Sequence, residues 1–111
     1  MTNVYSEFPH VSHDHMKTML NCFIICESCA KMCIDEGHKV TAKLCLDCAD
    51  VCNLAIKLHS RDSEFNRKVM DLCADVCARC GEECAKNKAA HCQQCSEICF
   101  DCAEACSSTH Y

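Results

Sequence analysis

The amino-acid sequence predicts an all-α protein, an antiparallel up-down-up-down four-helix bundle with a cysteine-lined core. Sixteen cysteines fall into four clusters, and every gap inside a cluster is three or four residues. Side chains at this spacing share one face of an α-helix, whereas those of a β-strand alternate between faces. The chain has only two glycines and one proline, so it lacks the turns of a loop-rich disulfide scaffold. Its 111 residues suffice for one domain, which we place at residues 12–108 after an N-terminal tail at residues 1–11.

The first two predicted helices have recognisable ends. Ser12 or Asp14 can cap the first helix, because short oxygen-bearing side chains accept hydrogen bonds from free helical N–H groups. The first helix is expected to end at Gly37, since glycine favours the left-handed conformation that closes helices. The second helix is expected to begin near Thr41 and to run to about His59.

The last two helices follow a short polar connection. Residues 59–63, with the sequence HSRDS, have no apolar periodicity and contain several capping side chains, so they predict a loop. The third helix is expected to end near Asn87. The fourth is expected to run from about Ala89 to Ser107.

The cysteines occupy the heptad positions that carry leucine and isoleucine in ordinary bundles, so the thiols are expected to point inward. The second helix is poorer in sulfur, with Ala55 at its next heptad position. We expect all sixteen cysteines to be metal ligands: Cys22, Cys26, Cys29, Cys33, Cys45, Cys48, Cys52, Cys73, Cys77, Cys80, Cys84, Cys92, Cys95, Cys99, Cys102 and Cys106.

Other apolar residues flank the cysteine stripes. Gly81 lies inside the third helix at a cost of about 1 kcal/mol relative to alanine, which close helix packing would explain. The flanking residues are expected to seal the seams between helices or to form a subunit contact: Leu20, Phe23, Ile24, Leu44, Val51, Leu54, Val69, Leu72, Val76 and Ile98.

Disulfides are a poor explanation for so many cysteines. Helical neighbours three or four residues apart have Cβ atoms roughly 5 to 6 Å apart, whereas a disulfide needs about 3.8 Å. The N-terminus lacks a basic start followed by an apolar run, and no apolar stretch reaches the roughly 18 residues of a membrane span. We therefore expect a cytoplasmic protein with reduced thiols and no membrane association.

The chemistry of thiolates limits the choice of metal to Cu(I), zinc or an iron-sulfur cluster. Five Cys-x-x-Cys pairs are expected to hold ions between their two sulfurs: 26 with 29, 45 with 48, 77 with 80, 92 with 95 and 99 with 102. Zinc remains feasible, since about four ions in tetrahedral sites would use every cysteine. Iron-sulfur ligands usually lie on loops, so straight helices suit a cluster poorly. Charge favours Cu(I), because buried thiolates must be neutralised and about one monovalent ion per cysteine would do so.

These observations favour a binding protein over an enzyme, and we expect no catalytic residue. The interpretation is a store of many Cu(I) ions, for sequestration or detoxification, that can supply copper enzymes. Two alternatives remain open: a zinc or general thiol metal buffer, and an iron-sulfur electron carrier. Nucleic acid is not an expected partner, because the formal charge is −5 and the basic residues are scattered.

The four helical cysteine stripes with their Cys-x-x-Cys pairs resemble the cytosolic branch of the bacterial copper storage proteins, over residues 12–108. This resemblance implies a bundle formed before metal binds, Cu(I) held by core thiolates, and assembly commonly as a tetramer. It also implies an entrance for copper at one end of the bundle, near Cys33, Cys84 and Cys92, with Met32, His38 and His91 as entrance ligands.

The opposite end of the bundle carries a second group of candidate ligands. Heptad counting places His15, Met19, His59 and Met70 on the stripes there. These residues either fill the core and a solvated helix end, or bind Cu(I) weakly, because imidazoles and thioethers are also ligands for this ion.

Overall fold

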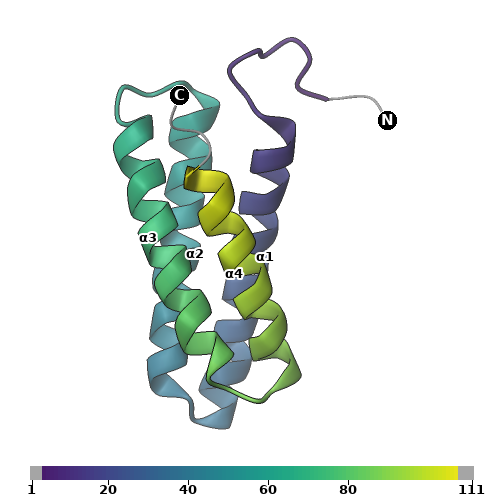
Figure 1. The fold of residues 1–111 in the computed structure, drawn as a ribbon, viewed down its shortest axis with the longest axis vertical. Coiled ribbons are helices and arrows are strands. Elements are labelled where there is room, and N and C mark those ends of the chain that lie inside the picture. Colours follow the sequence, from purple (N-terminus) through teal and green to yellow (C-terminus); the bar gives the residue numbers. More distant parts are fainter. Residues whose placement is uncertain (1–3, 108–111) are drawn as a thin grey trace.

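The computed structural model describes residues 4–107 and contains four α-helices and no β-strand within that range (Figure 1). The predicted all-α class is therefore confirmed. Residues 1–3 of the predicted tail and residue 108 of the predicted bundle lie outside the described residues. The helices are α1 (His13–Glu36), α2 (Lys39–Ser60), α3 (Asn66–Ala85) and α4 (Ala90–Ser107).

The helices alternate in direction and form a ring around a shared centre (Figure 1). Each helix packs against two neighbours, in the cyclic order α1, α2, α3, α4, while the backbones of the diagonal pairs stay apart within the described helices and only their core side chains meet. We call the end with the short connections 37–38 and 86–89 the two-loop end. The other end, with the connection 61–65 and the start of α1, is the one-loop end.

The ends of α1 follow the predicted capping chemistry. The Ser12 hydroxyl accepts a hydrogen bond from the backbone N–H of His15 at 3.5 Å. Gly37 has a φ of 82°, in the left-handed region, and the N–H of His38 donates to the Cys33 carbonyl at 2.8 Å. This tight closure lets α2 begin at Lys39, two residues before the predicted start at Thr41.

The flanking apolar residues divide into two sets. Six of them are partly buried and pack against the core: Phe23, Leu44, Val51, Val69, Val76 and Ile98. Four others are between 43 and 52% exposed: Leu20, Ile24, Leu54 and Leu72. The first set seals the seams between helices, while the second lies on the outer surface.

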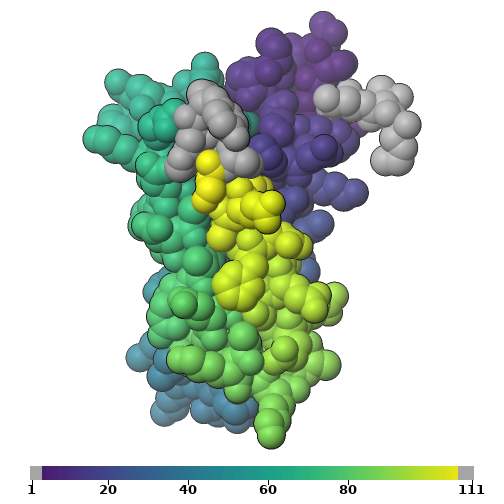
Figure 2. Space-filling view, viewed as in Figure 1, coloured from purple at the N-terminus to yellow at the C-terminus, as the bar shows by residue number. Residues whose placement is uncertain are grey.

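Close packing accounts for the glycine inside α3. A Cβ at Gly81 would lie 3.1 Å from the Phe100 ring of α4. In addition, the Ser96 hydroxyl donates to the Gly81 carbonyl at 2.9 Å. On the face drawn in Figure 2, α4 accordingly lies between α3 and α1 with its seams closed by side chains. None of the described helices combines the length and apolar character that crossing a membrane requires.

The segment preceding α1 is folded against the bundle. Tyr5 and Val11 pack against the core, and the Tyr5 ring meets the His13 ring edge-on, with their centroids 5.4 Å apart. His10 Nε2 lies 2.8 Å from the Ser60 carbonyl oxygen at the end of α2. The described part of the predicted tail therefore runs beside the one-loop end.

Candidate metal centre

Cysteine is the main component of the core. All sixteen cysteines are free thiols and are at most 2% exposed. The other fully buried side chains are small alanines or flexible methionines, such as Ala49, Ala55 and Met19. The thiols therefore face the shared centre of the bundle, where sulfurs from different helices can meet.

Side chains from two, three or four helices meet in compact groups whose ligand atoms all lie within 4.8 Å of one another. Two sulfurs that share one metal ion lie at most about 4.6 Å apart if each bond is about 2.3 Å long, so this spacing suits joint binding. Five of the groups are Cys22/Cys52/Cys77/Cys102, Cys22/Cys26/Cys48/Cys99, Cys26/Cys80/Cys95/Cys99, Cys29/Cys45/Cys84/Cys95 and Cys29/Cys33/His91/Cys92.

These groups overlap along the core from the two-loop end as far as Cys22. Cys22 belongs to the first and second groups, and Cys26 and Cys99 belong to the second and third. Cys95 belongs to the third and fourth groups, and Cys29 belongs to the fourth and fifth. The sulfurs therefore form a continuous column in which each group shares at least one ligand with the next.

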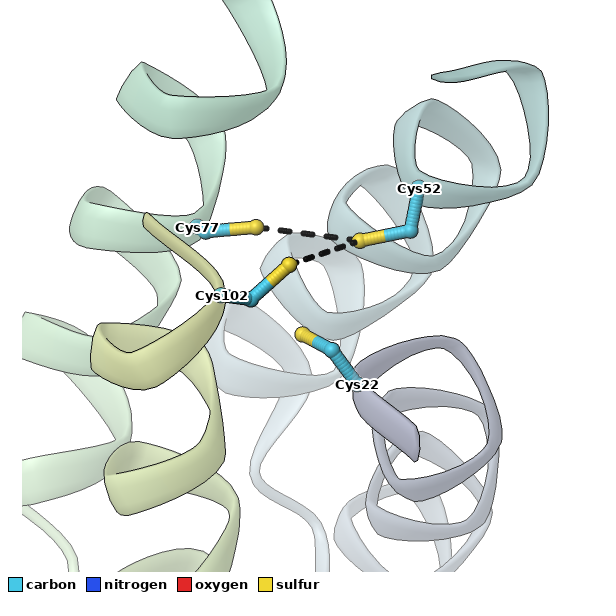
Figure 3. Close-up of side chains that lie close together, drawn as sticks. All are labelled: Cys22, Cys52, Cys77 and Cys102. Atoms are coloured by element: carbon cyan, nitrogen blue, oxygen red, sulfur yellow. Dashed lines mark hydrogen bonds between the residues drawn. The ribbon is translucent and has the colours of Figure 1, made fainter. Parts of the chain in front are cut away.

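The first group shows how the four helices contribute. Cys22, Cys52, Cys77 and Cys102 come from α1, α2, α3 and α4 and point toward one another (Figure 3). The Cys52 sulfur lies 3.7 Å from that of Cys77 and 3.9 Å from that of Cys102. Cys73 extends the column, with its sulfur 3.8 Å from that of Cys52.

The expectation that Cys-x-x-Cys pairs act together is wrong for these five groups, because none of them contains both members of such a pair. Same-helix sulfurs that touch are instead four residues apart, as in Cys22 with Cys26 at 3.9 Å and Cys73 with Cys77 at 3.8 Å. At 3.6 residues per turn, a residue four along is displaced by about 40° around the helix and one three along by about 60°. The sulfurs of a Cys-x-x-Cys pair therefore belong to different groups.

Burial and neighbouring thiols raise the pKa of some thiols in the column and lower the pKa of others. Burial raises the pKa of Cys33 to about 11 and also raises the pKa of Cys92. Hydrogen bonding with Cys45, with a smaller contribution from His91, lowers the pKa of Cys29 to about 6. Thiols with a raised pKa carry a proton before metal binds. An ion that binds their thiolate form must displace that proton, so metal binding releases protons.

His91 completes the column at the two-loop end. Its Nδ1 lies 3.2 Å from the Cys29 sulfur and 3.6 Å from the Cys92 sulfur. Its Nε2 lies 2.8 Å from a carboxylate oxygen of Glu36. Because this carboxylate can only accept, Nε2 carries the proton of the neutral imidazole, and in that form Nδ1 faces the sulfurs with its lone pair.

The Glu36 carboxylate also affects the charge of His91. Burial opposes protonation of the imidazole, but the hydrogen bonds to Glu36 and Cys29 outweigh burial and raise the pKa of His91. Sequence reasoning missed Glu36. Its position in the last turn of α1 was a usable signal, because an acidic residue is unfavourable at the negative end of the helix dipole.

The other two predicted entrance ligands do not face the column. Met32 is 42% exposed, because it is offset by one residue, about 100°, from the core position of Cys33. His38 lies in the α1–α2 connection with its side chain 44% exposed, and its Nε2 is 3.9 Å from a Glu36 carboxylate oxygen. Of these three predictions, the structure brings only His91 to the sulfurs.

Three of the four candidate ligands at the one-loop end are buried in the core, and the fourth is partly buried. Met19 and Met70 are 0 and 1% exposed, and His59 is 8% exposed. Burial lowers the pKa of His59, with smaller contributions from His10 and His15. His15 is partly buried.

The sequence and the fold resemble known proteins over most of the chain. The sequence model of the family described as Copper storage protein matches residues 9–111. The uncharacterized cysteine-rich protein YhjQ of Bacillus subtilis (strain 168) is 40% identical over 82 residues, which are 70% of this chain and 76% of that protein.

Two solved structures illustrate the structural likeness. The Cu(I)-bound copper storage protein BsCsp3 superposes with a TM-score of 0.86 at 36% identity, over 90% of this chain and 98% of that chain. A cytosolic copper storage protein from Streptomyces lividans, in a structure with five coppers, has a TM-score of 0.81 at 32% identity, over 86% of this chain and 88% of that chain.

Proposed function

Because the chain belongs to the copper storage protein family, we propose that it stores Cu(I) on the thiolates of its core, on the order of one ion per cysteine. The observation that carries this proposal is the column of overlapping sulfur groups that extends along the core from the two-loop end to Cys22. A single catalytic or structural site would need only one of these groups. A column of such groups provides capacity, which is what storage requires.

The sharing of sulfurs supports Cu(I) over zinc. A structural zinc site is closed by four ligands of its own, whereas neighbouring groups in this core share Cys22, Cys26, Cys29, Cys95 and Cys99. A thiolate shared between two positions can bridge two ions. Monovalent ions at about one per thiolate also leave the buried column neutral, which avoids the cost of burying charge.

We assign all sixteen cysteines as ligands for the stored ions and His91 as an additional ligand at the two-loop end. Glu36 orients the His91 imidazole by accepting from Nε2–H, so Nδ1 is available beside Cys29 and Cys92. Carboxylates commonly orient metal-binding histidines in this way. Met32 and His38 have no such role in this proposal because they face solvent.

The cellular setting of this proposal is the cytoplasm, where the protein sequesters copper and can supply it to copper enzymes. The Streptomyces lividans relative is described as cytosolic, which supports this location. A homo-oligomer, with a tetramer as the specific expectation, is supported by the exposed apolar side chains Leu20, Ile24, Leu54 and Leu72.

An anaerobic Cu(I) titration of the reduced protein against a competing chelator, with a parallel count of free thiols, tests the function. We expect uptake to continue to about one ion per cysteine while free thiols disappear in proportion. Tight uptake of about four zinc ions with little copper binding would favour a zinc buffer instead. A coloured protein with bound iron would favour the electron carrier.

A further inference from the structure

The group at the two-loop end differs in composition from the other four groups named above. Those four consist of sulfur alone, whereas this one combines Cys29, Cys33 and Cys92 with the His91 imidazole. His91 is also the one member of the five groups that is only partly buried, with 14% of its side chain exposed. An ion that arrives from this end therefore meets a nitrogen ligand before it reaches the part of the column that is all sulfur.

A nitrogen ligand is not needed to hold Cu(I) in a core of sixteen thiols. Imidazole also binds Cu(II), which forms the strongest complexes of the divalent first-row metals. Glu36 accepts from Nε2–H of His91 at 2.8 Å, and a carboxylate in this position makes the imidazole a more basic ligand. The two-loop end is thus suited to receive a divalent copper ion, and the thiols beside it are reductants.

Cys33 and Cys92 are the thiols best placed to supply electrons. Their sulfurs lie 3.8 Å apart on α1 and α4, and a disulfide would bring them to about 2.0 Å. The contact between Cys33 and Cys29, at 3.9 Å, is a poorer pair, because residues four apart on one helix hold their Cβ atoms too far apart for a disulfide. Neither Cys33 nor Cys92 occurs in another of the five groups, so their oxidation leaves the other four intact.

Cys29 connects this end to the remainder of the column. Its sulfur lies 3.2 Å from His91 Nδ1, and it also belongs to the next group, Cys29/Cys45/Cys84/Cys95. A Cu(I) ion formed beside His91 can therefore keep the Cys29 sulfur as a ligand while it gains ligands deeper in the core. The shared thiol passes the ion inward, and the two unshared thiols provide the electrons.

We propose that the two-loop end reduces Cu(II) and delivers the Cu(I) product to the column. Two Cu(II) ions each accept one electron, the S–H bonds of Cys33 and Cys92 break, one S–S bond forms between these residues, and two protons pass to water. The proposal rests on the storage function, because the remaining thiols bind both Cu(I) ions. The protein would then take up copper in either oxidation state, and uptake of Cu(II) would use the two thiols that the other groups do not share.

Anaerobic addition of copper(II) chloride to the reduced, metal-free, full-length protein tests the proposal. A disulfide is a two-electron couple, so about two equivalents of Cu(II) per chain match one pair of thiols. Electron paramagnetic resonance detects Cu(II) but not Cu(I), and we expect its signal to disappear. Peptide mass spectrometry, after copper is removed and the remaining thiols are alkylated, should find one disulfide, between the peptides of Cys33 and Cys92. A persistent Cu(II) signal, or disulfides distributed over the column, would overturn the proposal.

Matched variants give a second measurement. Cys33→Ser and Cys92→Ser should each lose this crosslink and reduce Cu(II) more slowly than the unaltered protein, because the ion must then reach deeper thiols. Ala30→Ser is the control, since Ala30 is buried on α1 and the change adds a hydroxyl without removing sulfur; it should keep the crosslink and the rate. Equal rates in all of these proteins would overturn the proposal. If a variant does not fold, the crosslink in the unaltered protein decides.

The Cu(I) titration separates this proposal from the storage function. Full uptake of Cu(I) by a protein that leaves the Cu(II) signal unchanged would overturn the reduction and leave storage intact. Failure of tight Cu(I) uptake by the unaltered protein would overturn storage itself, and with it the delivery of the product to the column.

Discussion

Replacing Cys52 by serine tests whether the sulfur column holds ions jointly. The Cys52 sulfur lies 3.8 Å from that of Cys73, 3.7 Å from that of Cys77 and 3.9 Å from that of Cys102. A hydroxyl has nearly the shape of a thiol, but it is a hard oxygen ligand that Cu(I) does not favour. Cys52→Ser therefore removes one ligand from three sulfur contacts with little change in packing.

The number of copper ions that Cys52→Ser should lose depends on the missing thiolate charge and on whether the missing sulfur bridged two ions. One fewer thiolate leaves one Cu(I) without a neutralising charge, so at least about one ion per chain should be lost. If the missing sulfur bridged two ions, the loss rises to about two. Anaerobic native mass spectrometry of the fully loaded protein resolves single copper ions and gives this number directly.

Ala49→Ser is the matched control, because Ala49 is fully buried on the same helix and the change adds a hydroxyl without removing sulfur. Either buried hydroxyl, if unpaired, should destabilise the metal-free protein by about 1 to 3 kcal/mol. The melting temperature would then fall by about 4 to 8 °C per kcal/mol. A full complement of copper in Cys52→Ser, or an equal copper loss in Ala49→Ser, would refute the idea of jointly held ions.

Three further predictions concern capacity, pH and the histidine at the two-loop end. Ala55→Cys adds a thiol at a fully buried position of the stripe, so native mass spectrometry should show about one more Cu(I) per chain; unchanged capacity would contradict the heptad argument. Burial raises the pKa of Cys33 to about 11 and also raises the pKa of Cys92, so the folded metal-free protein favours the neutral form of these two thiols. This stabilisation is complete below the unfolded thiol pKa of about 8.5 and is lost as pH rises through the folded values; circular dichroism should show a falling melting temperature from about pH 8.5 to 11, and a constant value would count against it. Glu36→Ala removes a hydrogen bond that raises the pKa of His91, so nuclear magnetic resonance of the metal-free protein should give a lower His91 pKa than in the unaltered chain, and an equal value would exclude the contact.

Much of the fold could be predicted because its signals are local. Ser12 and Gly37 bound α1 through short-range hydrogen bonds and backbone freedom, and the three-four spacing of the cysteines identifies the buried face of each helix. The burial of all sixteen thiols, and hence the soft-metal chemistry, follows from the same periodicity. Met19 and Met70 were placed in the core by heptad counting alone, and both are buried.

The grouping of the sulfurs depends on packing between helices. Spacing along one helix suggested that Cys26 would act with Cys29, yet the Cys26 sulfur lies 3.5 Å from that of Cys99 on α4. Likewise, the contact between Glu36 and His91 joins residues 55 positions apart, and no local pattern encodes it. Each helix presents its own cysteine stripe independently, but the heights at which four stripes meet are set by connection lengths and seam packing. Local periodicity thus dictates which atoms face inward, and the assembled bundle dictates which of them can share an ion.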